Sequence, residues 1–171
     1  MTNKTRCKWC NLKNPVYVKY HDEEWCKPNF DDKYLFKMLI LESFQAGLSW
    51  ECILNKREDF IKAYDDFDID KICNYDNNKI EELLLNKKII RNKLKINASI
   101  KNAKIFKDIQ KEYGTFYNYL KTFTKGKTVY EIGYFRTIRF NFKRFTKKRN
   151  EVCWVYYNLF IFASYWSYIF T

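Results

Sequence analysis

The chain has 171 residues and a formal net charge of +12, from 32 basic and 20 acidic side chains. That length suits one domain and is enough to bury a sizeable core. Hydrophobic residues make up 47% and aromatic residues 20% of the chain, which excludes general disorder; four glycines and two prolines are too few for a sandwich or barrel of many short strands. The basic excess predicts attraction to nucleic acid or an anionic membrane, although simple solubility explains it equally well.

The first 30 residues are polar, rich in Cys, Trp and Tyr, and contain both prolines, so we expect an irregular leader. Helix signals follow one another from there on: N-cap residues stand at Asp31, Ser49, Asp68 and Asp76, and Gly114 is a C-terminal cap. No segment before residue 130 alternates with period two, so the body is predicted to be all-α. The expected helices cover about 32–47, 50–64, 69–73, 77–86, 91–112 and 115–123.

The composition changes abruptly after residue 133. Residues 136–149 hold seven basic side chains and no acidic one, and the twenty residues 152–171 carry no charge. A polybasic segment before an apolar stretch of this length is typical of a membrane anchor. However, the stretch is crowded with Tyr, Trp and Phe and contains Asn158, Ser164 and Ser167, so we expect no membrane span.

The first long helix places an acidic residue on its apolar face. Leu35, Met38, Leu39, Glu42 and Ala46 follow helical spacing, so Glu42 lies among apolar side chains. A buried carboxylate is costly without a positive or hydrogen-bonding partner. Glu42 therefore either pairs with another helix or waits for a cationic or hydrogen-bond-donating ligand.

Aromatic residues flank this carboxylate in the sequence. They either close the core or form a flat-walled pocket for a planar ring, with cation–π attraction if the ring is positive. Composition leaves both interpretations open. The residues are Trp9, Tyr17, Tyr20, Trp25 and Trp50.

The start of the chain resembles half of a zinc site, although a structural or surface role for these residues explains them equally well. Cys7 and Cys10 have a Cys-x-x-Cys spacing, and His21 is the only histidine. A structural zinc site needs four ligands, and Cys26 and Cys153 are the other candidates considered. Because Met1 to Trp9 lacks the apolar run of a signal peptide, we expect reduced thiols and a cytoplasmic location.

Three stretches give a specific resemblance. They are Arg6-Cys7-Lys8-Trp9, Tyr20-His21-Asp22-Glu23-Glu24-Trp25 and Leu41-Glu42-Ser43-Phe44-Gln45-Ala46-Gly47-Leu48-Ser49-Trp50, continued by Ile89-Ile90-Arg91, Lys95-Ile96 and Asn102-Ala103. In order and spacing, over residues 6–133, the chain resembles the 3-methyladenine DNA glycosylase I family. The resemblance implies the all-α helix-hairpin-helix glycosylase fold. It also implies hydrolysis of the N-glycosidic bond of 3-methyladenine in alkylated double-stranded DNA, a step of base-excision repair, after base flipping.

The same resemblance implies roles for single residues. Glu42 matches the carboxylate that hydrogen-bonds the lesion, and Gly47 and Leu48 match the loop that enters the gap left by the flipped nucleotide. Arg91 and Lys95 are expected at the DNA backbone, and Cys7 and His21 match two of four structural zinc ligands. The residues expected to stack on or line the base are Trp50, Tyr20, Trp9, Tyr17 and Trp25.

The chain departs from the family pattern at several positions. Ser43, Cys26 and Lys88 stand where the family has glycine, and Lys88 occupies a hairpin turn that favours positive φ. The final family helix and the second zinc ligand pair are missing, so zinc binding is in doubt. A choice of synonymous codons for Glu151 to Tyr168, shifted by one base, reads KFVGSTIIYSYLQAIGV, a family-like continuation. We therefore interpret residues 134–171 as an out-of-frame tail and 1–133 as the glycosylase domain.

Two functional hypotheses follow. The first is a monomeric DNA-3-methyladenine glycosylase with an intact pocket half, whose activity the altered C-terminus impairs. The second is a non-catalytic basic protein that binds DNA or a membrane.

Overall fold

The computed structural model describes residues 4–25 and 27–124, and within them it is helical without a strand. This confirms the all-α prediction. The tail over residues 134–171, including the proposed frameshift, lies outside the described residues. In chain order the elements are α1 (Pro15–Glu23), α2 (Asp32–Gln45), α3 (Trp50–Asn55), α4 (Arg57–Ala63), the 3-10 turn η1 (Asp65–Phe67), α5 (Ile69–Cys73), α6 (Asn77–Leu85), α7 (Lys93–Tyr113) and α8 (Phe116–Thr124).

Helix capping explains most of these boundaries. The Asp31 and Ser49 side chains accept hydrogen bonds from the N–H groups of Tyr34 and Cys52, and so begin α2 and α3. Gly114 ends α7 with a φ of 79°, the left-handed conformation that glycine adopts without strain. The local sequence therefore sets where these helices start and stop.

Two expectations about the elements were wrong. The leader is not irregular throughout, because Asn14 caps a nine-residue helix, α1, whose first residue is Pro15. Pro is favoured at this first helical position since it lacks only an N–H that would have no partner there. The helix expected over 50–64 is broken at Lys56, whose φ of −102° and ψ of 0° separate α3 from α4.

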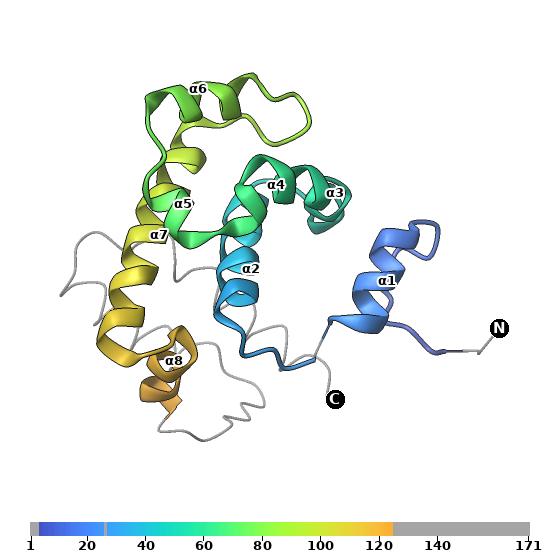
Figure 1. The fold of residues 1–171 in the computed structure, drawn as a ribbon. Helices are drawn as coiled ribbons and strands as arrows, with labels where there is room; N and C mark the ends of the chain where they lie inside the picture. The colour runs from blue at the N-terminus through green and yellow to red at the C-terminus, as the bar shows by residue number, and fades with distance from the viewer. Residues whose placement is uncertain (1–3, 26, 125–171) are drawn as a thin grey trace.

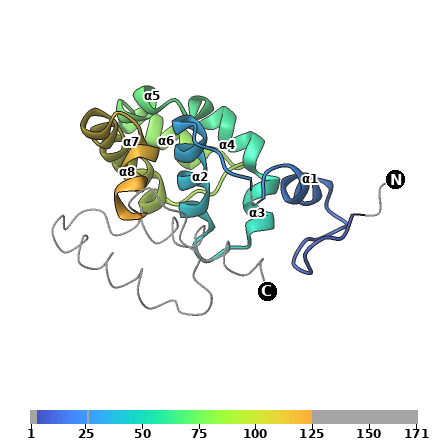
Figure 2. The ribbon, with the colours of Figure 1, turned by 90° about the horizontal axis from the view of Figure 1, so that it is seen from below.

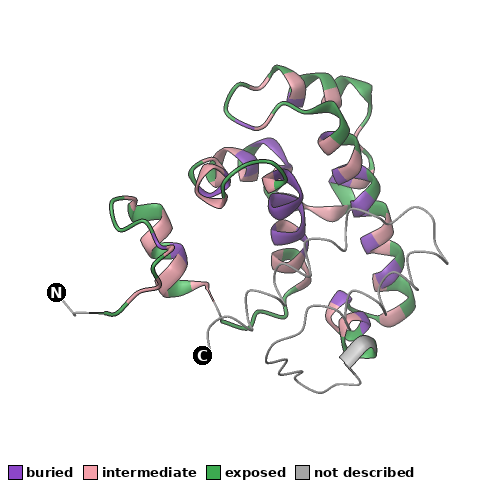
Figure 3. Cartoon of the chain, turned by 180° about the vertical axis from the view of Figure 1, so that it is seen from behind, coloured by how far each residue is buried: buried purple, intermediate pink, exposed green. Residues whose placement is uncertain are grey.

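The core is centred on α2, which is buried around most of its circumference (Figure 3). Phe36, Ile40, Leu41 and Phe44 are fully enclosed. A helix that is apolar on nearly all sides belongs inside a protein. Glu42 and Ser43 are the two polar exceptions on it.

α2 and α7 run in opposite directions and are joined by hydrogen bonds at both ends (Figure 1). At one end, the Asp32 carboxylate accepts from Gln110 Nε2 at 2.6 Å and from the N–H of Phe116 at 3.0 Å. At the other end, Lys95 Nζ lies 2.8 Å from the carbonyl oxygen of Phe44. The direction of α7 relative to the central helix is thus fixed along its length.

Two segments stand at the margins of this core. α6, the loop over residues 86–92 and α7 form a helix-hairpin-helix arrangement, and Lys56 Nζ donates to the Lys88 carbonyl at 2.9 Å to hold the loop against α3 and α4. α1 lies on the other side of α3, as the view from below shows (Figure 2). Among the helices of residues 4–25 and 27–124, none combines the length and apolar character that crossing a bilayer requires.

Candidate functional site

Glu42 is a buried carboxylate, with 7% of its surface exposed, near the C-terminal end of α2. Neither a hydrogen bond nor an ion pair reaches it from the described part of the chain. Burial alone raises the pKa of Glu42 well above its usual value. Of the two interpretations of this residue, the described contacts favour the carboxylate without a protein partner over the inter-helix salt bridge.

The structure brings all five predicted aromatic side chains into one cluster beside this carboxylate. The ring centres of Tyr20 and Trp50 lie 5.5 Å apart, and those of Tyr20 and Trp25 lie 6.1 Å apart. Trp9 continues the cluster, at 4.9 Å from Trp25 and 5.5 Å from Tyr17. Each spacing is within the usual range for interacting aromatic rings.

Tyr20 connects the aromatic cluster with the acid. Its burial raises the pKa of its hydroxyl, and the negative charge of Glu42 raises it further. Tyr20 is itself 4% exposed. An electron-rich, apolar wall thus stands next to a carboxylate, and this combination favours a planar ligand that is positively charged or donates hydrogen bonds.

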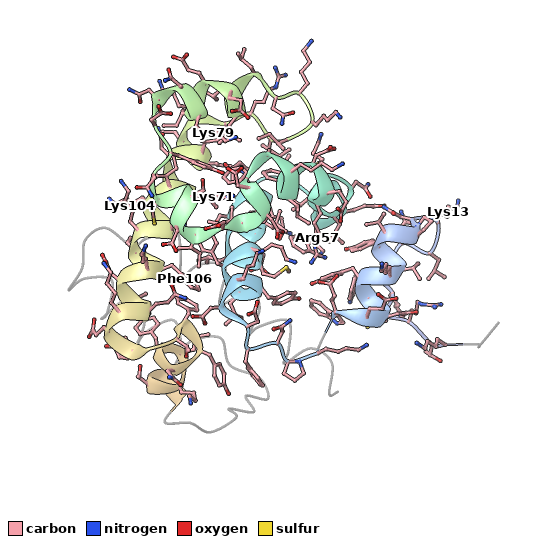
Figure 4. The ribbon with its side chains drawn as sticks, in the orientation of Figure 1. Lys13, Arg57, Lys71, Lys79, Lys104 and Phe106 are labelled. Carbon is pink, nitrogen blue, oxygen red and sulfur yellow. The ribbon has the colours of Figure 1, made fainter. Side chains whose placement is uncertain are left out.

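The aromatic wall is attached to the core by an ion pair that the sequence analysis missed. Arg57, at the start of α4, donates two hydrogen bonds to Glu24, at 2.7 and 2.8 Å (Figure 4). Tyr34 of α2 donates a third, at 3.2 Å. Burial by itself raises the pKa of Glu24. The hydrogen bonds and the positive charge of Arg57 lower it by more, so the pKa of Glu24 lies below its usual value. Glu24 precedes Trp25 directly, and its place in the Tyr20–Trp25 motif was the available signal.

A second polar contact attaches the other end of α1. Asn14 donates to Glu51 Oε1 at 2.7 Å and to Asn55 Oδ1 at 2.9 Å, and both acceptors belong to α3. α3 begins with Trp50, so the leader aromatics and Trp50 are held to the same helix. The two ends of α1 are therefore positioned by side chains about 30 to 40 residues away in the sequence.

The predicted insertion residues form a tight loop between Glu42 and Trp50. Gly47 has a φ of +81°, and nothing lies within 4 Å of the place of an added Cβ, so glycine is needed there for its backbone conformation. Leu48 is 40% exposed, although it is a large apolar side chain. The loop therefore presents a leucine to solvent beside the aromatic cluster.

The hairpin carries exposed positive charge. Lys87, Lys88 and Arg91 are all exposed. Left-handed φ values of non-glycine residues occur, among the described residues, only at 65–67, so Lys88 does not need the conformation expected of the family's glycine.

An open depression of about 700 Å³ lies between the hairpin and the helices α3 and α4. It is lined by Ser49, Glu51, Cys52, Asn55, Lys56, Asp59, Lys87 and Lys88.

Lys95 lies at the hairpin, but its ammonium group contacts protein. Nζ donates to the carbonyl oxygens of Phe44, at 2.8 Å, and Ala46, at 2.6 Å. Burial lowers the pKa of Lys95. The DNA-backbone role predicted for Lys95 stays a prediction, and in this structure its ammonium is engaged by protein carbonyls, whereas no such bond reaches Arg91 from the described residues.

Cys7 and His21, the two expected zinc ligands, are neighbours through the Cys7 backbone. The N–H of Cys7 donates to His21 Nε2 at 3.3 Å, and His21 Nδ1 lies 3.0 Å from Asp22 Oδ1, so Nδ1 carries the ring proton. A carboxylate that orients a histidine in this way is common around bound zinc. Nevertheless, within the described residues no three His, Cys, Asp or Glu side chains gather to hold a metal. The described residues include Cys7 and His21, two of the four ligands that a tetrahedral zinc site needs.

The unpaired state of Glu42 predicts a pH-dependent stability. Because its folded pKa is raised, the folded state binds more protons than the unfolded state above the ordinary pKa, about 4.3, and the free energy of unfolding falls as pH rises. Glu42→Gln removes this loss. We expect the variant to be more stable than the parent at pH 7–8 and the difference to vanish below about pH 4. Urea unfolding at both pH values measures it.

Exposed Glu81 provides the control for that comparison. Glu81→Gln should change the free energy of unfolding by less than about 0.5 kcal/mol at either pH. A Glu42→Gln stabilisation of equal size at both pH values would contradict the raised pKa.

The Glu24–Arg57 pair predicts a strong energetic coupling. Arg57→Met leaves a half-buried carboxylate with one of its three hydrogen bonds, and we expect a loss of roughly 2 kcal/mol in unfolding free energy. The double variant Glu24→Gln/Arg57→Met should recover much of that loss, as a double-mutant cycle in urea would show. Lys111→Met, which breaks an exposed pair with Asp108, serves as the control and should cost less than about 0.5 kcal/mol. Equal losses for Arg57→Met and Lys111→Met would refute the coupling.

Comparison with known proteins places this geometry in a family. The family model described as methyladenine glycosylase matches residues 9–141, past the boundary at residue 133 that the composition indicated. The DNA-3-methyladenine glycosylase of Haemophilus influenzae is 38% identical over 125 residues, which are 73% of this chain and 67% of the relative. DNA-3-methyladenine glycosylase 1 of Escherichia coli is 37% identical over 118 residues, or 69% and 63%. The chain thus spans about two thirds of the length of these relatives.

Solved structures agree with the sequence comparison. A crystal structure of 3-methyladenine DNA glycosylase I has a TM-score of 0.69 at 36% identity, over 74% of this chain and 69% of that one. A Staphylococcus aureus structure that addresses 3-methyladenine recognition gives 0.64 at 38% identity, over 70% and 65%. A solution structure of 3-methyladenine DNA glycosylase I gives 0.70 at 30% identity, over 91% and 89%. With its helical fold, its buried acid and its aromatic cluster, the chain belongs to the methyladenine glycosylase family.

Proposed function

We propose that this protein is a DNA-3-methyladenine glycosylase of base-excision repair. The observation that carries the proposal is the buried Glu42 carboxylate, which has no partner among the described residues and stands against the aromatic cluster. The relatives named DNA-3-methyladenine glycosylase support the same conclusion. The substrate is alkylated double-stranded DNA.

The chemistry of the lesion fits this site. Methylation at N3 makes the adenine ring cationic and weakens its glycosidic bond, so the enzyme has to select and extrude the base more than supply a strong acid. Glu42 attracts the cationic ring and accepts a hydrogen bond from its edge, while Tyr20 and Trp50 offer π faces. Neutral adenine gains no such attraction and is also held by pairing and stacking.

Bond cleavage requires no protonation of the base, because the methylated ring is already cationic. The bond from the sugar C1′ to the base breaks, and the base leaves as neutral 3-methyladenine with the electron pair. Water adds its oxygen to C1′ and releases a proton, which leaves an abasic site. The role of Glu42 is to stabilise the extruded cation in position for this step.

DNA is held and opened by the neighbouring elements. The exposed cations of the hairpin, including Lys88 and Arg91, bind phosphates without reading sequence, and the net charge of +12 adds to that attraction. Leu48 enters the space that the flipped nucleotide vacates. The protein acts as a monomer, and the bacterial relatives support a cytoplasmic location beside the chromosome.

Excision and base binding test this function. We expect the protein to release 3-methyladenine from methylated duplex DNA and to bind the free base with quenching of tryptophan fluorescence. Glu42→Gln should weaken base binding by roughly 1–3 kcal/mol, since it removes a charge-assisted hydrogen bond. Trp50→Leu, which keeps apolar volume but removes the π face, should cost about 0.5–2 kcal/mol.

The control for both variants is Glu81→Gln, on the exposed face of α6. Base affinity that stays unchanged in Glu42→Gln would refute the assignment of the pocket. DNA binding without any base release would instead favour the non-catalytic DNA-binding hypothesis.

Zinc is the second part of the proposal. The family resemblance implies a structural zinc with Cys7 and His21 as ligands, and these two are adjacent here. Since four ligands are needed, we propose that the chain binds zinc weakly. Cys26 and Cys153, the other candidates, lie outside the described residues. Bound zinc would cross-link the start of the leader to α1.

Elemental analysis of purified protein decides the zinc question. We expect well under one zinc per chain after dialysis, and we expect Cys7→Ser to leave the metal content unchanged. Cys52→Ser, in α3, is the matched control. One tightly held zinc that is lost in Cys7→Ser and kept in Cys52→Ser would show that the site is complete, and the proposal would fail.

A further inference from the structure

Lys95 joins two segments that are far apart in the sequence. Its ammonium donates to the Phe44 carbonyl, at 2.8 Å, and to the Ala46 carbonyl, at 2.6 Å, across 51 and 49 residues. These oxygens belong to the last turn of α2 and to the start of the loop that presents Leu48. The same loop leads into Trp50.

The end of α2 needs these donors. The last carbonyls of a helix have no partner within it, and a left-handed cap residue commonly supplies the missing bonds. Ala46, the residue after the helix, has a φ of −49° and a ψ of 116°, and the left-handed residue comes one position later, at Gly47. The Leu48 N–H reaches the Gln45 carbonyl at 2.6 Å, which closes the turn but leaves Phe44 and Ala46 to Lys95. A positive charge is also favourable at a helix C-terminus.

The other end of the Lys95 side chain is fixed beside the hairpin. Lys95 is the third residue of α7, and its own N–H donates to the N-cap Asn92 at 3.1 Å. The hairpin over residues 86–92, with exposed Lys88 and Arg91, comes directly before it. One side chain therefore sets the distance between the loop that carries Leu48 and the hairpin.

We propose that Lys95 is a positioning residue that holds the Leu48 loop in register with the hairpin, and that it does not bind a DNA phosphate. The inference rests on the proposed function: in the complex, Leu48 has to enter the duplex at a fixed offset from the phosphates that the hairpin holds. Two of the three ammonium protons are already directed at carbonyl oxygens. These two bonds tie the loop to the start of α7, and a Lys95 side chain drawn away to a phosphate would lose them.

Salt dependence distinguishes the two roles. The slope of log K against log salt concentration is negative, and its magnitude falls by about 0.9 when one phosphate contact is lost. Loss of a positioning residue leaves this slope unchanged. We expect Lys95→Met to keep the parental slope on duplex DNA and to bind free 3-methyladenine within about twofold of the parent. Its excision from duplex should fall at least tenfold, mainly in kcat, with less base flipping seen by 2-aminopurine fluorescence beside the lesion.

Two further variants make the test decisive. Arg91→Gln, at an exposed hairpin cation, should reduce the slope, which calibrates the measurement. The double variant Leu48→Ala/Lys95→Met should excise 3-methyladenine from duplex DNA at the same rate as Leu48→Ala alone, because Lys95 acts through the position of Leu48. If Lys95→Met destabilises the fold, Lys95→Arg replaces it: a phosphate contact tolerates arginine, whereas the longer guanidinium displaces the loop and slows excision.

A reduced slope for Lys95→Met, full excision by Lys95→Arg, or additive effects of Leu48→Ala and Lys95→Met would overturn the inference. The slope reports DNA binding alone, and the two excision results require an active parent, so none of the three contradicts the proposed function. A parent protein that binds duplex DNA and releases no base would instead refute the proposed function.

Discussion

The constraint on which this structure depends is the burial of a carboxylate in its central helix. Glu42 is surrounded on α2 by side chains that make the core, and no described group neutralises it. An isolated buried charge opposes folding, so the surrounding apolar contacts have to offset it. The same arrangement carries the proposed function, because a buried carboxylate without a partner among the described residues would attract a cationic ring.

The remaining elements can be understood by how they serve that carboxylate. α1 carries Tyr20 against it, and the Glu24–Arg57 pair and the Asn14–Glu51 contact hold α1 to α3 and α4. The loop after α2 carries Leu48 towards Trp50, and Lys95 joins the end of α2 and this loop to the start of α7. Polar contacts between distant segments thus position the groups that the apolar core cannot orient, since apolar packing is non-directional and hydrogen bonds are directional.

Much of the fold was predictable because its signals are local. The four expected N-caps are confirmed at Asp31, Ser49, Asp68 and Asp76. Each side chain accepts a hydrogen bond from a backbone N–H two or three residues further along the chain. The leader was expected to be irregular because of its composition, yet one Asn–Pro pair starts α1. The break at Lys56 leaves no comparable mark in the sequence, because no glycine or proline stands there.

The sequence by itself determined the helical class, most helix ends, the family, and the presence of an acid among apolar residues, because these follow from spacing along one chain. Only the tertiary structure decided what each long side chain reaches. It assigned Arg57 to Glu24 and Lys95 to the carbonyl of Phe44 at the end of α2. The reason is physical: these partners are 33 to 51 residues apart in the chain, and the packing of the helices between them brings them within hydrogen-bond distance.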